Sequence, residues 1–191
     1  MNTATFFPVA KCLWLVFFLY WAISALRGKV AKKTESGAER LKRMIPLAAA
    51  YFLLFHPAAH FSWLGRRFVF DSSAAGGVGV LLTTAGVALA IWARWHLGAN
   101  WSAIVSIREQ HELIRSGPYG RVRHPIYTGM LLAMAGTALV LGEVRGLLAF
   151  AITLVAFYWK ARKEEAWLMR EFGEKFDAHA KRTGMFLPRF P

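Results

Sequence analysis

Long apolar stretches alternate with polar ones along the whole chain. A helix that spans the hydrocarbon core of a bilayer needs about 20 apolar residues. Pro46 and Pro125 stand at the start of two of the stretches, where a missing N–H costs a helix little. The pattern predicts an all-α integral membrane protein with about five transmembrane helices, near residues 6–26, 44–64, 74–95, 125–141 and 145–159.

Glycines mark a turn and a packing surface in this pattern. Only residues 142–144, Gly-Glu-Val, separate the last two stretches. They predict a tight helical hairpin whose second arm is short for a full span. The third stretch contains Gly76-Gly77-Val78-Gly79. A phosphate-binding loop needs a strand before it and a helix after it, so we interpret these glycines as sites of close helix packing.

Basic residues gather on one side of the expected helices. The 191 residues include 24 Lys and Arg against 11 Asp and Glu. Twenty of those 24 lie in segments 27–43, 94–123 and 160–189, which share one side if there are five spans. Cytoplasmic loops attract Lys and Arg, so we expect a cytoplasmic C-terminus and an N-terminus on the other side. A basic inner face suits anionic lipid, so the expected partner is the membrane and not nucleic acid.

Composition excludes several other classes of protein. Hydrophobic residues make up 56% of the chain and charged residues 18%, against about 45–50% and about 25% in soluble domains. A single cysteine, Cys12, excludes a disulfide framework and a cysteine-based zinc site. No GxGxxG motif supports a Rossmann-type site. We expect one domain over residues 1–191, with no metal site.

Segment 97–127 is too patterned to be a plain connector. Arg123 and His124 stand directly before Pro125, and Tyr127 follows two residues after it. Cationic and aromatic groups therefore converge where the fourth span begins. Ionisable groups at membrane depth point to function, but a positively charged anchor with an interfacial tyrosine explains the same residues.

Segment 160–190 predicts an amphipathic helix that opens with Lys163, Glu164 and Glu165. This helix would lie on the membrane or pack on the spans. The adjacent carboxylates, which follow directly on a short span, could bind a cation. The apolar positions near helical spacing are Trp167, Leu168, Phe172 and Phe176.

Three pieces of the C-terminal half carry a family resemblance. They are NWSA at 100–103, HELIRSGPYGRVRHPIYTG at 111–129 and EEAWLMREFGEKFDAHAKRTG at 164–184. The combination of GxYxxxRHPxYxG with EExxxxxxFGxxF is specific. In these pieces the sequence resembles the isoprenylcysteine carboxyl methyltransferase family, part of a wider group of small membrane methyltransferases that includes phospholipid N-methyltransferases.

The resemblance implies a cytosolic pocket for S-adenosylmethionine, formed by segment 97–124 and the C-terminal helix and open sideways to lipid. Segments 97–127 and 160–190 would hold the cofactor. The substrate would be lipidated or hydrophobic, with the prenylcysteine carboxylate as the typical target. Carried over by position, the cofactor residues are His111, Glu112, Leu113, Ile114, Tyr119, His124, Pro125, Ile126, Tyr127 and Glu164.

The resemblance also suggests which residues act at the reaction centre, namely Arg123, Tyr127 and Lys160. The family's substrate-positioning arginine lies four residues before the cofactor glutamate, where this chain has Lys160. A lysine lacks the bidentate fork that suits a carboxylate. The family's C-terminal tyrosines are replaced here by Phe176 and His179.

The residue types suit methyl transfer on chemical grounds as well. The carboxylate of Glu164 can hold the α-ammonium group of the cofactor, and the face of Tyr127 is compatible with a sulfonium. A carboxylate acceptor is already anionic and needs no general base. An amine acceptor must lose a proton, and His124 or Glu165 could assist.

Three other functions remain open at this point. A phospholipid amine or small thiol could be the acceptor, which the lysine at position 160 motivates. Membrane sterol reductases, which use NADPH, end in a similar Arg/His-Pro-x-Tyr and acidic pattern. The chain could also be a non-catalytic scaffold with basic cytosolic loops.

Overall fold

The computed structural model describes residues 3–26, 37–98 and 113–189, and the regular elements in these ranges are helical. The short 3₁₀ turns within these ranges are η1 (Thr3–Phe6), η2 (Pro57–Ala59), η3 (Ser62–Gly65) and η5 (Gly117–Gly120). The α-helices are α1 (Phe7–Leu26), α2 (Gly37–Phe55), α3 (Ser73–Leu97), α4 (Pro125–Leu141), α5 (Val144–Phe172) and α6 (Glu174–Arg182).

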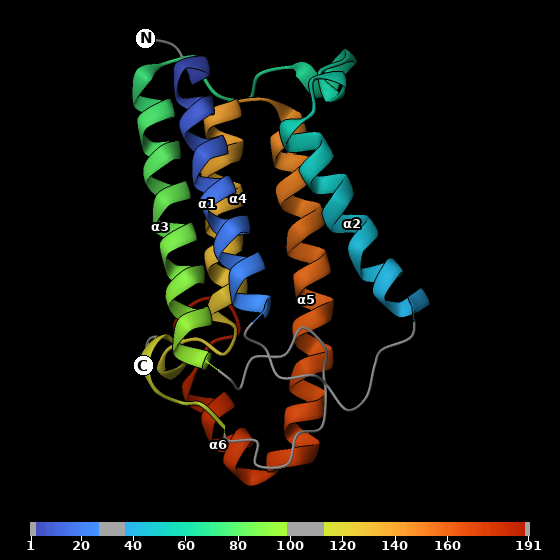
Figure 1. Ribbon diagram of the computed structural model, residues 1–191, viewed down its shortest axis with the longest axis vertical. Helices are drawn as coiled ribbons and strands as arrows, with labels where there is room; N and C mark the ends of the chain where they lie inside the picture. The colour runs from blue at the N-terminus through green and yellow to red at the C-terminus, as the bar shows by residue number, and fades with distance from the viewer. Residues whose placement is uncertain (1–2, 27–36, 99–112, 190–191) are drawn as a thin grey trace.

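The first five α-helices form an upright bundle in which successive helices run in opposite directions (Figure 1). α1, α3 and α4 stand together, α5 lies beside them, and α2 leans against α5. The helix α6 lies at the same end of the bundle as the C-terminal end of α3 (Figure 1). Helices α1, α3 and α5 are long and apolar enough to cross a membrane, whereas α2 and α4 offer shorter apolar helices. The expected all-α membrane architecture is confirmed.

Small and polar residues organise the centre of the bundle. The indole Nε1 of Trp14 donates to Thr137 Oγ1 at 2.9 Å, and Thr137 lies 3.3 Å from the hydroxyl of Thr83. All three side chains are buried, so this network joins α1, α3 and α4 where no water can satisfy polar groups. A Cβ on Gly79 would lie 2.9 Å from the backbone nitrogen of Val140. Close packing is thus confirmed for Gly79, whereas a Cβ on Gly77 would meet no atom within 4 Å.

The second apolar stretch does not form the helix expected over residues 44–64. Helix α2 begins earlier, at Gly37, so Pro46 lies inside the helix and not at its start. The helix ends at Phe55, because Pro57 has no N–H to continue it and opens η2 instead. The side chain of Arg145 satisfies carbonyls at the helix end, since its Nη1 donates to the carbonyl of Leu53 at 3.2 Å and to that of His56 at 3.0 Å.

The expectation of a separate helix opening at Lys163 is wrong. The hairpin itself is confirmed, since Gly142 and Glu143 alone separate α4 from α5. Helix α5, however, continues without a break from Val144 to Phe172. Charged residues near 160 end the apolar run, but they do not end the helix, because a helix that leaves the membrane keeps its backbone hydrogen bonds. The adjacent Glu164 and Glu165 therefore lie on a rigid helix continuous with the last span.

Candidate active site

The backbone around His124 joins the entry of α4 to the C-terminal segment. His124 is the N-cap residue of α4, and Pro125 follows at the first helical position. The backbone N–H of Arg123 donates to Gly184 at 2.9 Å, and that of His124 donates to Met185 at 3.1 Å. These bonds hold residues 123–124 and 184–185 side by side, so segments more than 50 residues apart meet at one end of the bundle.

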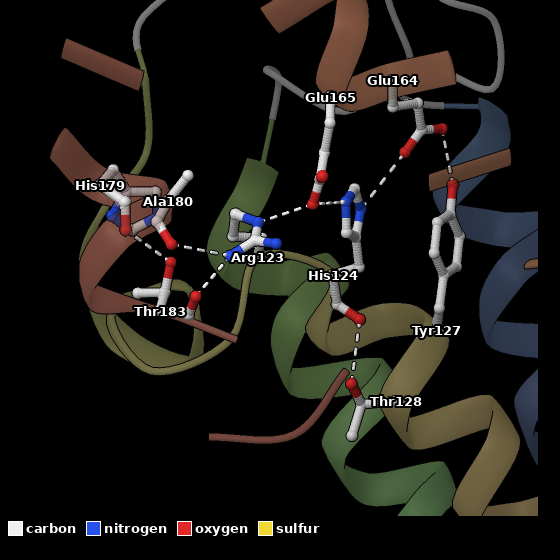
Figure 2. A network of polar contacts seen from close by, with 9 residues as sticks. All are labelled: Arg123, His124, Tyr127, Thr128, Glu164, Glu165, His179, Ala180 and Thr183. Carbon is white, nitrogen blue, oxygen red and sulfur yellow. Dashed lines mark hydrogen bonds and ion pairs between the residues drawn. The ribbon is translucent and has the colours of Figure 1, made fainter. Parts of the chain in front are cut away.

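Four side chains form a continuous polar network at this junction (Figure 2). Arg123 Nε donates to Glu165 Oε1 at 2.6 Å, and the same oxygen lies 3.2 Å from His124 Nε2. The other ring nitrogen of His124, Nδ1, lies 3.5 Å from Glu164 Oε2. Tyr127 extends the network, since its hydroxyl donates to Glu164 Oε1 at 2.6 Å. Helix α5 supplies both carboxylates, and the start of α4 supplies the groups that face them.

The two carboxylates determine the charge of His124, which is 6% exposed. Burial alone would favour the neutral ring, but hydrogen bonds and charge from Glu164 and Glu165 outweigh it and raise the pKa of His124 above 6.5. An ionised carboxylate can only accept hydrogen bonds, and each ring nitrogen faces one. The two carboxylates therefore favour the protonated form of the His124 ring, with Nε2 directed at Glu165 and Nδ1 at Glu164.

Lys160 and the ring of Tyr127 lie beside Glu164. The Nζ atom of Lys160 lies 3.8 Å from Glu164 Oε1 and 5.0 Å from the centre of the Tyr127 ring. Tyr127 stacks on Phe157 at 4.8 Å and lies nearly parallel to the His124 ring at 5.4 Å. Glu164 keeps 24% of its side chain exposed. This side of the network combines a carboxylate, an ammonium and an aromatic face.

Arg123 connects the network to α6 (Figure 2). Its Nη1 donates to the carbonyl of Ala180 at 3.1 Å and to that of Thr183. His179 lies buried on α6 near this guanidinium. Burial lowers the pKa of His179, and the positive charges of Arg115 and Arg123 lower it further. The guanidinium of Arg123 therefore holds the C-terminal helix against α5.

The structure brings together many of the residues that the sequence put forward. Glu164, His124 and Tyr127 are in direct contact. Arg123 lies in the same network, and Lys160 lies at its edge. The positions His111 and Glu112 lie outside the described residues. Leu113 is half-buried and Pro125 is fully buried, while one apolar cluster with Phe157 and Ala161 contains Ile114, Tyr119, Ile126 and Tyr127.

The sequence did not indicate the part played by Phe186. Its ring lies 6.2 Å from that of His124 and 6.5 Å from that of Tyr127. Its carbonyl accepts a hydrogen bond from Thr128 Oγ1 at 2.8 Å. No spacing signal could have found this residue, because its own backbone carbonyl, and not its side chain, makes the bond to Thr128. Phe186 therefore packs edge-on against both rings.

Comparisons with known proteins identify related sequences. The family model described as phospholipid methyltransferase matches residues 75–175, which is just over half of the chain. The protein-S-isoprenylcysteine O-methyltransferase of Schizosaccharomyces pombe is 32% identical over 97 residues, covering 49% of this chain and 41% of that protein. The human protein of the same name is 30% identical over 113 residues, covering 58% and 40%.

A differently named relative matches to the same degree. The nickel-cobalt-cadmium resistance protein of Alcaligenes xylosoxydans xylosoxydans is 33% identical over 95 residues, covering 49% of this chain and 44% of that protein. The match thus covers only 40–44% of the length of these three relatives.

The fold is also that of a solved structure. The eukaryotic intramembrane Ras methyltransferase, isoprenylcysteine carboxyl methyltransferase, superposes with a TM-score of 0.60 over 97% of this chain and 67% of that one, at 21% identity. This likeness supports a multi-pass helical membrane fold. The family model over residues 75–175 shows that the chain belongs to the phospholipid methyltransferase family, whose members are membrane methyltransferases that use S-adenosylmethionine.

Proposed function

We propose that this protein transfers a methyl group from S-adenosylmethionine to the carboxylate of a lipidated or otherwise hydrophobic substrate. The observation that carries the proposal is the carboxylate of Glu164, partly exposed between the hydroxyl of Tyr127 and the ammonium of Lys160. The group lies on α5 beyond the apolar part of that helix, where a substrate from the bilayer and a cofactor from the cytosol would meet.

The donor set at this point fits the cofactor. Glu164 Oε1 accepts one hydrogen bond from Tyr127, and a carboxylate offers about four acceptor positions, so a further donor such as the cofactor's α-ammonium can be accommodated. When bound, the cofactor supplies an activated methyl group on a positively charged sulfur. The Tyr127 ring offers the aromatic face that a sulfonium favours. Members of the family use this cofactor, which favours it over NADPH.

The proposed division of roles follows the contacts. Glu164 would bind the ammonium group, and Tyr127 would orient Glu164 and border the reaction centre. Lys160 would hold an anionic acceptor. Arg123 is already bonded to Glu165 and to two carbonyls of the C-terminal segment, which supports a positioning role. The remaining proposed cofactor residues are His111, Glu112, Leu113, Ile114, Tyr119, His124, Pro125 and Ile126.

The state of the two candidate bases supports a carboxylate acceptor over an amine. An amine must lose a proton before it can accept a methyl group. Both ring nitrogens of His124 face carboxylates, and Glu165 is held between Arg123 and His124. Neither group is free to take a proton. A carboxylate needs none, so positioning and partial desolvation suffice for it.

The membrane arrangement proposed here has five spans with the site on the cytoplasmic side. The alternating directions of α1 to α5 in Figure 1 support this count. The C-terminal end of α3 and the helix α6, which carries Lys175, Lys181 and Arg182, then lie on this side.

A panel of acceptors tests the proposal. Purified protein in detergent is given cofactor labelled on its methyl group, with farnesylcysteine, a phospholipid amine and a small thiol as acceptors. We expect label in farnesylcysteine that mild base releases, as it does from an ester. Label in the phospholipid amine would show that the acceptor is an amine and not a carboxylate. The name of the matching family model favours that outcome. No transfer and no cofactor binding would favour a non-catalytic scaffold.

A further inference from the structure

The two adjacent glutamates of α5 face different partners. Glu164 contacts Tyr127 and Lys160 on the side where the cofactor and acceptor would bind. Glu165, one position further along the helix, turns to Arg123 and His124, and only 12% of its side chain is exposed. Successive residues of a helix point in directions about 100° apart, so two neighbours can serve separate surfaces.

We propose that Glu165 is a positioning residue for methyl transfer, which acts through His124 on Glu164 and through Arg123 on the C-terminal segment. The inference rests on the proposed function for its link to catalysis. Glu165 Oε1 is the atom common to both connections, since it accepts a hydrogen bond from Arg123 Nε at 2.6 Å and lies 3.2 Å from His124 Nε2.

The first connection fixes the carboxylate that would bind the cofactor. Glu165 holds one nitrogen of His124, and the other nitrogen then faces Glu164 Oε2 at 3.5 Å. A protonated ring satisfies both carboxylates at once. A neutral ring would turn a lone pair toward one of them, which would displace it. The orientation of Glu164 therefore depends on the proton that Glu165 helps His124 to keep.

The second connection closes the site. Glu165 fixes the guanidinium of Arg123, whose Nη1 donates to the carbonyls of Ala180 and Thr183. The chain then continues to Phe186, which lies over the rings of His124 and Tyr127 (Figure 2 shows the polar part). Loss of the Glu165 charge would loosen this cover and the bound cofactor with it.

Several charged groups surround His124 and set its response to pH. Helix α5 contributes Glu164 and Glu165, and Lys160 acts on His124 through its contact with Glu164. Arg123 adjoins Glu165, while His179 of α6 lies near that guanidinium, which together with burial lowers the pKa of His179. Among these, Glu165 is the carboxylate that can be neutralised without removing the proposed cofactor ligand.

The test uses E165Q, with E171Q as a matched control on the exposed surface of α5. The glutamine side chain of E165Q still offers an acceptor oxygen, so a protonated His124 can keep its place at low pH. We expect methyl transfer by E165Q within about threefold of wild type at pH 6, and roughly tenfold or more below it at pH 8. The acceptor carboxylate is ionised at both pH values, and E171Q should follow wild type throughout.

A second readout does not depend on activity. The ring carbon resonance of His124, identified by its loss in H124N, reports protonation directly. We expect its titration midpoint to fall by about one pH unit in E165Q and to stay unchanged in E171Q. If E165Q is too unstable to record, E165D keeps the charge and should restore a midpoint near that of wild type.

Two results would overturn the inference: an unchanged midpoint in E165Q, or a loss of activity of the same size at every pH. Failure of the proposed function looks different. In that case wild type itself would neither bind the cofactor nor transfer a methyl group, while the His124 midpoint would still show whether Glu165 holds the ring.

Discussion

His124 links the stability of the folded protein to pH. Burial opposes its charge, but Glu164 and Glu165 raise the pKa of the folded protein's imidazole above the usual 6.5. A group whose pKa is higher in the folded than in the unfolded protein stabilises the folded state. This contribution is fully present at pH values below the unfolded-state pKa, and it is lost as the pH rises through the folded-state pKa. The folded protein should therefore be most stable relative to H124N at mildly acidic pH.

Thermal unfolding in detergent between about pH 5.5 and pH 9, a range that brackets the ordinary histidine pKa, measures this. The melting temperature of wild type should fall across the upper part of the range, whereas H124N should lack that component. Parallel curves for the two proteins would show that His124 does not carry the effect.

Lys160 determines how an anionic acceptor can be held. Its single ammonium lies beside Glu164 and over the Tyr127 ring. An arginine offers two parallel donors that match a carboxylate. We expect K160R to lower the KM for farnesylcysteine about threefold or more, and K160M to raise it about tenfold. Steady-state kinetics measure both, with the exposed K163R as a control; identical KM values in all variants would remove Lys160 from the acceptor site.

Residue types at the site followed from the sequence, but their partners did not. The motif around Arg123-His124-Pro125 and the pair Glu164-Glu165 indicated a cation- and carboxylate-rich site. Nothing in their spacing showed that Arg123 would bond to Glu165 and to the carbonyls of the C-terminal segment. Such contacts depend on how α4, α5 and α6 meet, and backbone acceptors leave no mark in side-chain patterns.

At the scale of elements, the sequence predicted the bounds of a helix well where a proline marked its start and a glycine its end. The bounds of α4 follow from Pro125 at its start and Gly142 at its end, and the prediction of 125–141 is confirmed. The end of α2 was misplaced because apolar residues continue beyond Pro57 in 3₁₀ turns. The end of α5 was misplaced because hydropathy reports the membrane boundary and not the helix boundary.

The contact between α3 and α4 depends on glycines that face each other. A Cβ on Gly86 would lie 2.5 Å from the carbonyl oxygen of Gly129, where rigid backbone cannot yield. Overpacking of this kind costs about 1–3 kcal/mol. G86A should therefore lower the melting temperature by about 5 °C. The control is G77A, because a Cβ there meets no atom within 4 Å; equal melting temperatures for the two variants would contradict this packing.

At the scale of the whole molecule, the charge distribution predicts one orientation in the membrane. In a C12S background, F70C places a thiol at a position whose side chain is 94% exposed, in the loop between α2 and α3. K181C places one on α6, where the lysine side chain is 73% exposed. A membrane-impermeant maleimide added to intact cells of an expression host should label position 70, and position 181 only after permeabilisation. Labelling in the reverse order would invert the proposed topology.

The fold brings the open end of the α4–α5 hairpin against the C-terminal segment that follows α5. Residues 113–127 and 160–186 meet at one end of the bundle, and the other helices hold them there. The proposed chemistry needs this meeting, since Glu164 lies on one side of it and His124 and Tyr127 lie on the other.

Equilibrium binding of S-adenosylmethionine to the purified protein tests this account most directly. Wild type and E171Q should bind with the same Kd, and E164Q should bind at least about tenfold more weakly, because a charged hydrogen bond to the ammonium group is lost. Equal affinity in all three proteins would contradict the assignment of Glu164 and of the site built around it.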